Sequence, residues 1–330
     1  MNSLAISAVL LLALSPALEA KTNSLLIEDM TWTEVRDAIA AGKTTAIYYA
    51  ASTEQNGPGV ALGKHVFIAH YLGQRIAARL GNALVYPTIP FAPTGDWGLT
   101  APGVIDPAKK TGHMRYPGSV NLSEETFGAV AHDVALSAIS AGFRNVVLMC
   151  DHGGEAQSQL EAVAKHLNAE WGPKGIHVYY IPDVYLKEKD VMKEYMQKHG
   201  LPIDSHAGTD DTSELEYVDK IVNGNSPKWI RPAKLIKGRE GDGTGVDGDE
   251  TKATLALGKR FTDAKVSLAV SQINELIAAG KWDCQKFCVL SPVDLTIDLE
   301  PIAEHHGKLR LCRTPFASRH LPLLGDLAQL

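Results

Sequence analysis

Short apolar segments alternate with longer segments of helical periodicity along most of this chain, and this alternation limits the folds open to it. Four apolar segments predict strands, at residues 44–50, 83–87, 145–149 and 176–181. Helical patterns lie before, between and after them, at residues 31–41, 66–80, 123–141, 155–170, 188–199, 213–221 and 251–279. Parallel strands need a crossover connection, usually a helix, so the order favours an α/β fold with a mostly parallel sheet covered on both faces.

The strand predicted at residues 145–149 runs into a turn that combines a histidine with glycines and acids. This turn reads Asp151-His152-Gly153-Gly154-Glu155. In open α/β sheets, ligands bind beyond the carboxyl ends of the strands. A neutral imidazole at that place suits a metal or a catalytic proton. On its own, the turn fits a polar surface loop equally well.

The length and charge of the chain exclude some classes of function. With 330 residues and 45% hydrophobic content, the chain can bury a large core, in one large α/β domain or two small ones. The net charge is -6 and no basic stripe is present. This argues against a nucleic acid as the partner and favours a small-molecule substrate.

The first twenty residues differ from the rest. The run Leu4 to Leu14 is apolar and uncharged, Pro16 follows it, and small residues lead to Ala20. This pattern resembles a signal peptide over residues 1–20 and predicts a periplasmic or secreted protein. An apolar N-terminus that is packed or disordered is the alternative. No other segment approaches the length of a membrane helix.

Three of the four cysteines lie near the C-terminus. An exported protein can hold disulfides, so one pair among Cys284, Cys288 and Cys312 is plausible in an extension over residues 281–330. Cys150 ends a predicted buried strand and fits a free, packed thiol. A zinc site at Cys284 and Cys288 is disfavoured, because no second ligand pair has suitable spacing.

Polar residues with little structural role gather in three loops that follow strands or helices. They read Glu54-Gln55-Asn56-Gly57-Pro58 with Lys64-His65, then Asp151-His152-Gly153-Gly154, then His206-Ala207-Gly208-Thr209-Asp210-Asp211-Thr212-Ser213. Two further segments are Tyr116-Pro117-Gly118-Ser119 and Gly248-Asp249-Glu250-Thr251-Lys252-Ala253-Thr254. In order and spacing, these five segments resemble the creatininase (creatinine amidohydrolase) family over roughly residues 30 to 280.

The resemblance implies a three-layer α/β/α sandwich over residues 21–280, with a metal site at the strand ends. It also implies hydrolysis of a C–N bond in a cyclic or linear amide, and a homo-oligomer, often a hexamer. The family holds two metals with a Glu, a His, a bridging Asp and the strand-end His. By position these fall on Glu54, Asn56, His65 and His152.

Two of these positions depart from the family pattern, and this changes the expected metal site. Bridging two metals usually needs a carboxylate, whereas the imidazole of His65 offers one lone pair, and Asn56 is a poor ligand. The expected site is therefore a single metal held by Glu54, His65 and His152. Zinc is favoured and would lower the pKa of its water to about 7, which generates the nucleophile, while manganese or iron is also compatible.

The remaining site residues are assigned by their position. The resemblance implies that His206 carries a proton to or from the reacting groups, and that Asp211 orients His206 or touches the metal. Candidates for substrate contact are Asn56, Trp97 and His113. Asp151 and Glu155 are candidates for a hydrogen bond to a ligating imidazole. Three functions remain open: an amidohydrolase, a lactonase or iron enzyme at the same site, and a binding protein without catalysis.

Overall fold

The sheet at the centre of the fold has four parallel strands. The computed structural model describes residues 24–280. The strands are β1 (Thr45–Ala50), β2 (Ala83–Val85), β5 (Asn145–Cys150) and β6 (His177–Tyr180), in the order β2-β1-β5-β6. Because β1 pairs with β5 in register from Thr45 opposite Asn145 to Ala50 opposite Cys150, the loops after both strands leave the same edge of the sheet.

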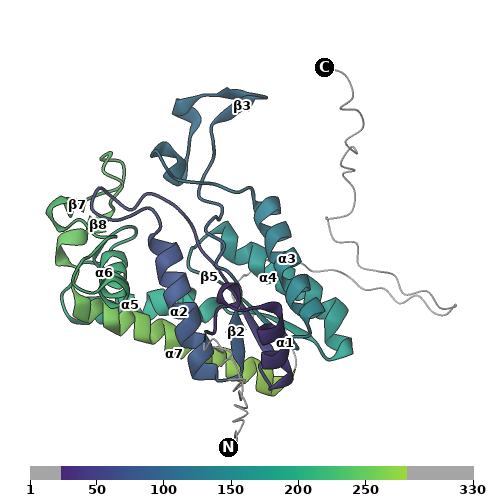
Figure 1. Cartoon of the computed structure of the whole chain (residues 1–330). Coiled ribbons are helices and arrows are strands. Elements are labelled where there is room, and N and C mark those ends of the chain that lie inside the picture. Colours follow the sequence, from purple (N-terminus) through teal and green to yellow (C-terminus); the bar gives the residue numbers. More distant parts are fainter. Residues whose placement is uncertain (1–23, 281–330) are drawn as a thin grey trace, which may run out of the picture. The chain divides into compact units, whose positions relative to one another are not determined.

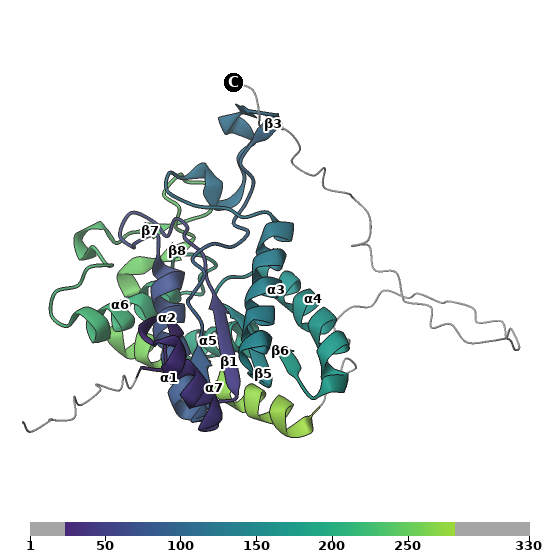
Figure 2. The ribbon, with the colours of Figure 1, turned by 45° about the vertical axis from the view of Figure 1, so that its right-hand side comes forward.

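Helices cover both faces of this sheet, as the alternation of the sequence predicts. They are α1 (Trp32–Ala40), α2 (Lys64–Leu80), α3 (Glu124–Ala141), α4 (Glu155–Trp171), α5 (Leu186–Lys198), α6 (Thr209–Asn223) and α7 (Leu255–Ala279). In Figure 2, α3 and α4 lie on one side of β1 and β5, and α2 and α6 lie on the other. This confirms the three-layer α/β/α sandwich.

Alternate residues of the strands supply two separate cores. Ile47 and Tyr49 of β1 face the core that also contains residues of α2, α6 and α7. Tyr48 of β1 and Leu148 of β5 face the core that also contains residues of α3 and α4. Since successive side chains of a strand point to opposite faces, a strand covered on both sides must be apolar throughout. The unbroken apolar runs of β1 and β5 have this cause.

Local signals place the helix ends close to the predicted positions. The Thr31 side chain accepts a hydrogen bond from the backbone of Glu34, and the Glu34 side chain accepts one from the backbone of Thr31, at 2.7 Å. This capping box starts α1. Ser123 caps α3, which ends at Gly142 with a φ of 105°, a conformation that glycine adopts without strain.

The segment from 91 to 116, which lies between the strand predicted at 83–87 and the helix predicted at 123–141, contains a small hairpin. Its strands are β3 (Leu99–Ala101) and β4 (Val104–Ile105), and it points away from the helices in Figure 1. Leu99, Val104 and Ile105 are exposed. The strands are very short and bury no face on the core, so no periodicity marks them in the sequence. A second pair, β7 (Lys237–Gly238) and β8 (Gly248–Asp249), closes the predicted glycine-rich loop.

Some predictions concern residues outside the described range. These are the signal peptide at residues 1–20 and the residues Cys284, Cys288 and Cys312. Cys150 is buried at the end of β5, where burial raises the pKa of its thiol, and it is a free cysteine. Between residues 24 and 280, none of the helices combines the length and apolar character needed to cross a membrane.

Glu250 provides a test of stability against pH. Its Oε2 accepts a hydrogen bond from the backbone of Ile236 at 2.9 Å, and its buried Oε1 has no hydrogen-bond partner in the described part of the chain. Burial raises the pKa of Glu250 to about 7. The folded state therefore favours the protonated carboxyl, and the stability this provides is present at acidic pH and lost as the pH rises through about 7.

We expect Glu250→Gln to stabilise the protein relative to wild type by about 1 kcal/mol at pH 8 and to have little effect at pH 5. Urea unfolding at both pH values measures the difference. The matched control is Glu240→Gln at an exposed position, which should change neither value. Equal effects of Glu250→Gln at both pH values would contradict the prediction.

Candidate functional site

A buried carboxylate lies at the centre of the candidate site. Glu54 follows β1, is 1% exposed, and donates its backbone N–H to Leu62 O at 3.0 Å. The loop is fixed further by Asn56, whose side-chain amide donates to Glu54 O at 2.9 Å, and by Ser119, whose Oγ accepts the backbone N–H of Gln55. These contacts hold the Glu54 carboxylate at the carboxyl-end edge of the sheet, where the loop after β5 also places His152.

Three imidazoles from different elements surround this carboxylate. His152 Nε2 is 2.8 Å from Glu54 Oε2, and His65 Nε2, in the first turn of α2, is 3.2 Å from Glu54 Oε1. His113 Nε2, from the 3-10 turn Gly112–Arg115, is 3.7 Å from Glu54 Oε1. Burial alone would raise the pKa of Glu54, but His152 and His65 outweigh it and hold the pKa well below its ordinary value. Glu54 is thus an anion at neutral pH.

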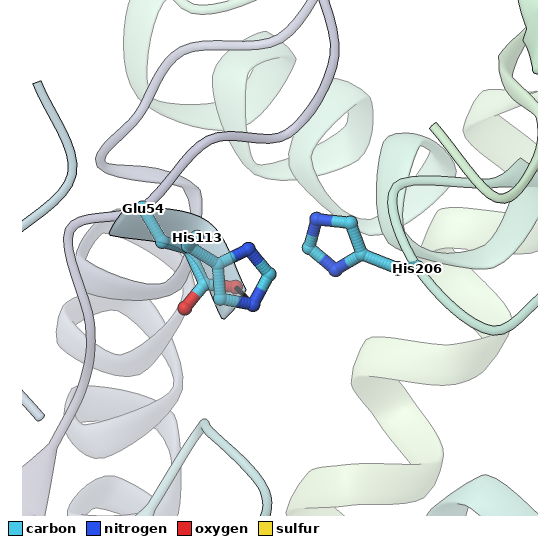
Figure 3. A group of neighbouring side chains, drawn as sticks. All are labelled: Glu54, His113 and His206. Atoms are coloured by element: carbon cyan, nitrogen blue, oxygen red, sulfur yellow. Dashed lines mark ion pairs between the residues drawn. The ribbon is translucent and has the colours of Figure 1, made fainter. Parts of the chain in front are cut away.

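Glu54, His113 and His206 form a compact group of metal-ligand type. One ligand atom from each lies within 4.8 Å of the others (Figure 3). Burial lowers the pKa of His113 to about 4. Burial, and then the charge of Lys64, also lower the pKa of His206. Both imidazoles are therefore neutral at pH 7. A carboxylate with neutral imidazoles is the donor set that zinc or manganese accepts in proteins.

His65 and His152 differ from this pair in their hydrogen bonds. His65 Nδ1 is 3.0 Å from Asp151 Oδ2, and His152 Nδ1 is 3.0 Å from Gly153 O. Both oxygens accept the Nδ1 proton, and the Nε2 of each ring faces the Glu54 carboxylate. A metal bound between them would take the Nε2 lone pair of each ring. Ligating histidines usually make such a bond with their other nitrogen. The predicted ligands His65 and His152 thus contact the Glu54 carboxylate at 3.2 and 2.8 Å, whereas Glu54, His113 and His206 are the group whose ligand atoms all lie within 4.8 Å of one another.

Asp151 lies in a buried charge network behind the site. Its Oδ1 is 3.0 Å from Lys265 Nζ, which is 2.6 Å from Glu214 Oε2. Burial would raise the pKa of Asp151, but Lys265 and His65 lower it. Asp151 makes the expected bond to an imidazole, that of His65. Glu155 is exposed at the start of α4, and no bond from its carboxylate to an imidazole is found in residues 24–280.

Lys64 and Asp211 fix the backbone next to His206 and so hold its imidazole in place. Lys64 is 1% exposed, and its Nζ is 2.9 Å from Asp211 Oδ1. The other oxygen of Asp211 accepts the N–H of Ala207 at 2.8 Å. Ala207 has a φ of 54°, an unfavourable conformation for a residue with a side chain, and this bond stabilises it. Of the two roles implied for Asp211, the geometry matches orientation of His206. Lys64 was not singled out in the sequence.

A cavity of about 680 Å³ opens next to His113 and His206. Its floor includes Gln55, whose Nε2 is 3.3 Å from His113 Nδ1 and 3.0 Å from His206 Nε2. One wall comes from residues 112–116 and the other from residues 239–247. The volume suits a small molecule. Asn56 and Trp97, predicted to contact substrate, are not among the residues that line this cavity, whereas His113 is.

Gly245, in the glycine-rich segment that lines the cavity, lies directly against the side chain of Gln55. It has a φ of 79°, and a Cβ at this position would lie 1.9 Å from Gln55 Oε1. We expect Gly245→Ala to displace Gln55 from the two histidines and to lower kcat/KM about ten-fold, with the bound metal retained. Gly243→Ala is the matched control, because it has a φ of 83° and open space around the added Cβ. If both variants lose the same activity, backbone strain and not the displacement of Gln55 is the cause.

Comparison with known proteins agrees with these features. A family model described as creatininase, creatinine amidohydrolase, matches residues 28–273. The creatinine amidohydrolase of Pseudomonas putida is 25% identical over 214 residues, which cover 61% of this chain and 77% of that protein. A crystal structure of creatinine amidohydrolase covers 77% of this chain and 98% of its own, with 18% identity and a TM-score of 0.59. Similar solved structures include a manganese form of creatininase and a Zn–Zn form of a creatininase variant.

Proposed function

This chain belongs to the creatininase family, whose members hydrolyse C–N bonds other than peptide bonds, and we propose that it cleaves such a bond in a small cyclic or linear amide. The observation that carries the proposal is the Glu54 carboxylate, which is buried among four histidines beside a cavity of suitable size. His65, His113 and His152 face it directly, and His206 completes the compact group.

We propose that the site holds one divalent metal, because Asn56 and His65 stand where the family resemblance implies a histidine and a bridging carboxylate. Glu54, His65 and His152 would hold it, since the Nδ1 atoms of both rings are bound to oxygens and their Nε2 atoms face the carboxylate. Asn56 is turned to the Glu54 backbone and offers no second carboxylate or imidazole. A bound zinc or manganese ion supplies Lewis acidity that activates water for attack on the amide carbonyl.

His206 is placed to move a proton. It lines the cavity and its imidazole is neutral at pH 7. Its Nε2–H donates to Gln55 O at 2.9 Å, which leaves Nδ1 as the nitrogen that can accept a proton. A neutral imidazole accepts a proton from the attacking water and returns it to the leaving nitrogen. The Asp211–Ala207 hydrogen bond keeps the ring in this position. His113, on the same floor, faces the substrate beside Glu54.

A panel of cyclic and linear amides, with lactones of the same ring sizes, tests this function on the purified, metal-loaded protein. We expect hydrolysis of at least one amide, and a loss of kcat of about 100-fold or more in His206→Asn with the metal retained. Faster hydrolysis of lactones would indicate a lactonase, and metal-loaded protein inactive on the whole panel would favour a binding protein. Loss of metal in His206→Asn would make His206 a ligand instead.

We further propose that the protein is exported to the periplasm or the medium and that it acts as a homo-oligomer. The first proposal is supported by the apolar pattern of residues 1–20. The second is supported by the family resemblance alone. Mass spectrometry of the mature N-terminus and light scattering test them separately.

A further inference from the structure

The walls of the cavity each contribute one arginine. Arg115 comes from the wall that carries His113, and Arg239 begins the glycine-rich wall that ends at Asp247. These two side chains are distant in sequence, yet both line the cavity whose floor is formed by Gln55, His113 and His206. Glu54 does not itself line this cavity, but His113 and His206 of its compact group do, and the two arginines line the same space.

Both guanidinium groups have donors left for a ligand. Arg115 uses its Nε–H in a 3.2 Å bond to Lys110 O, which leaves its two terminal amino groups. Neither Arg115 nor Arg239 has an acid within 4.0 Å of its guanidinium among residues 24–280, although the charge of Arg239 acts on the exposed Asp242, which also accepts its backbone N–H at 2.9 Å. Arg36 and Arg75 pair with acids at 2.7 and 3.3 Å, whereas the exposed Arg79, Arg144, Arg231 and Arg260 have no ion pair among residues 24–280 either. What distinguishes Arg115 and Arg239 is therefore their place on the cavity. The cavity thus offers unpaired forks of the kind that bind carboxylates with two parallel bonds.

Two acids also line the cavity, and one of them is engaged within the protein. Asp247 Oδ1 accepts the backbone N–H of Glu240 at 3.1 Å, and its Oδ2 accepts the hydroxyl of Ser205. Glu240 is exposed, and its carboxylate is the remaining acidic group at the mouth. Most of the charged groups in the cavity that remain free to bind a ligand are therefore the N–H donors of Arg115 and Arg239. Glycines at 241, 243 and 245 let a ligand approach the backbone of the same wall.

We propose that the substrate carries a carboxylate, bound by Arg115 and Arg239, and that its amide lies against His113 and His206, the residues beside Glu54 that line the same cavity. This inference rests on the proposed function and names its substrate class. The two arginines would distinguish neutral amides from acidic ones. A neutral amide offers the guanidinium groups no negative charge, whereas a carboxylate-bearing lactam or N-acyl amino acid can form an ion pair with them.

Matched pairs of probes test the substrate class by binding as well as by turnover. The first pair is pyroglutamate and its carboxamide, and the second is N-acetylglycine and N-acetylglycinamide. We expect the carboxylate member to bind more tightly in calorimetry on the full metal-loaded chain. Arg115→Gln and Arg239→Gln should each weaken that binding about ten-fold or more. The carboxamide member should bind equally well to wild type and to both variants.

Control variants and the separate readouts make the outcomes distinguishable. Arg36→Gln, at a residue that does not line the cavity, should change nothing, and Glu240→Gln should not weaken carboxylate binding. Carboxylates that bind without turnover would support this inference while removing the proposed hydrolysis of those amides. Equal binding of both members of each pair, no binding of any carboxylate probe at millimolar concentration, or binding that both arginine variants retain would overturn it.

Discussion

Replacing Glu54 by Gln is expected to reduce hydrolysis by roughly 1,000-fold or more and to remove most of the bound metal. Glu54 is 1% exposed and is the one carboxylate shared by His65, His113 and His152. The substitution removes its charge and replaces the carboxylate by a neutral amide, which is a poor metal ligand. The measurements are kcat/KM on any amide that the wild type hydrolyses, and metal content by mass spectrometry.

The control for Glu54 is another acid near the same site. Glu155→Gln changes an exposed carboxylate at the start of α4, three residues after His152, and should leave both activity and metal content unchanged. A Glu54→Gln protein that keeps its metal and at least about a tenth of wild-type activity would show that Glu54 is not the centre of the site.

The second large effect is expected on stability, from Lys265→Met. Lys265 is 3% exposed on α7, and its ammonium lies 3.0 Å from Asp151 Oδ1 and 2.6 Å from Glu214 Oε2. Removing the cation leaves the buried Glu214 without its ammonium partner and leaves Asp151 with the weaker support of His65 and the Tyr49 hydroxyl. We expect a loss of roughly 3–5 kcal/mol in the free energy of unfolding, measured in urea.

Two further variants separate this charge effect from lost packing. Lys265→Met with Glu214→Gln should recover part of the stability, because the buried Glu214 charge that lost its ammonium partner is gone. Lys259→Met, on the same helix, removes a 2.6 Å pair with Asp263 at a side chain that is 62% exposed, and should cost less than about 1 kcal/mol. A Lys265→Met protein within about 1 kcal/mol of wild type would show that the network contributes little.

The order of strands and helices could be predicted because burial on two faces leaves a clear signal. The apolar runs of β1 and β5 and the caps at Thr31 and Ser123 are local features of the sequence. The hairpin β3–β4 could not be predicted, since its strands are very short and bury nothing. The start of α6 was also placed four residues too late, because Thr209 to Thr212 read as loop residues and their burial comes from tertiary contacts.

The candidate site could be predicted where its residues follow strands or lie in the motifs. Glu54 and His152 were found in this way, and the structure brings them within 2.8 Å of each other. The place of His113 beside Glu54 was missed, because it depends on how the long loop folds back. Lys64 and Lys265 were missed for a different reason. A lysine on a helix is usually a surface residue, and only the packing of α2, α6 and α7 buries these two with their acids.

The most direct test of the site is the metal content of the purified full-length protein, measured by mass spectrometry together with protein concentration. We predict about one divalent metal per chain, lost in Glu54→Gln, because Asn56 and His65 stand where the family resemblance implies a histidine and a bridging carboxylate. Two metals per chain, or a fully active protein without metal, would contradict a single-metal centre at Glu54.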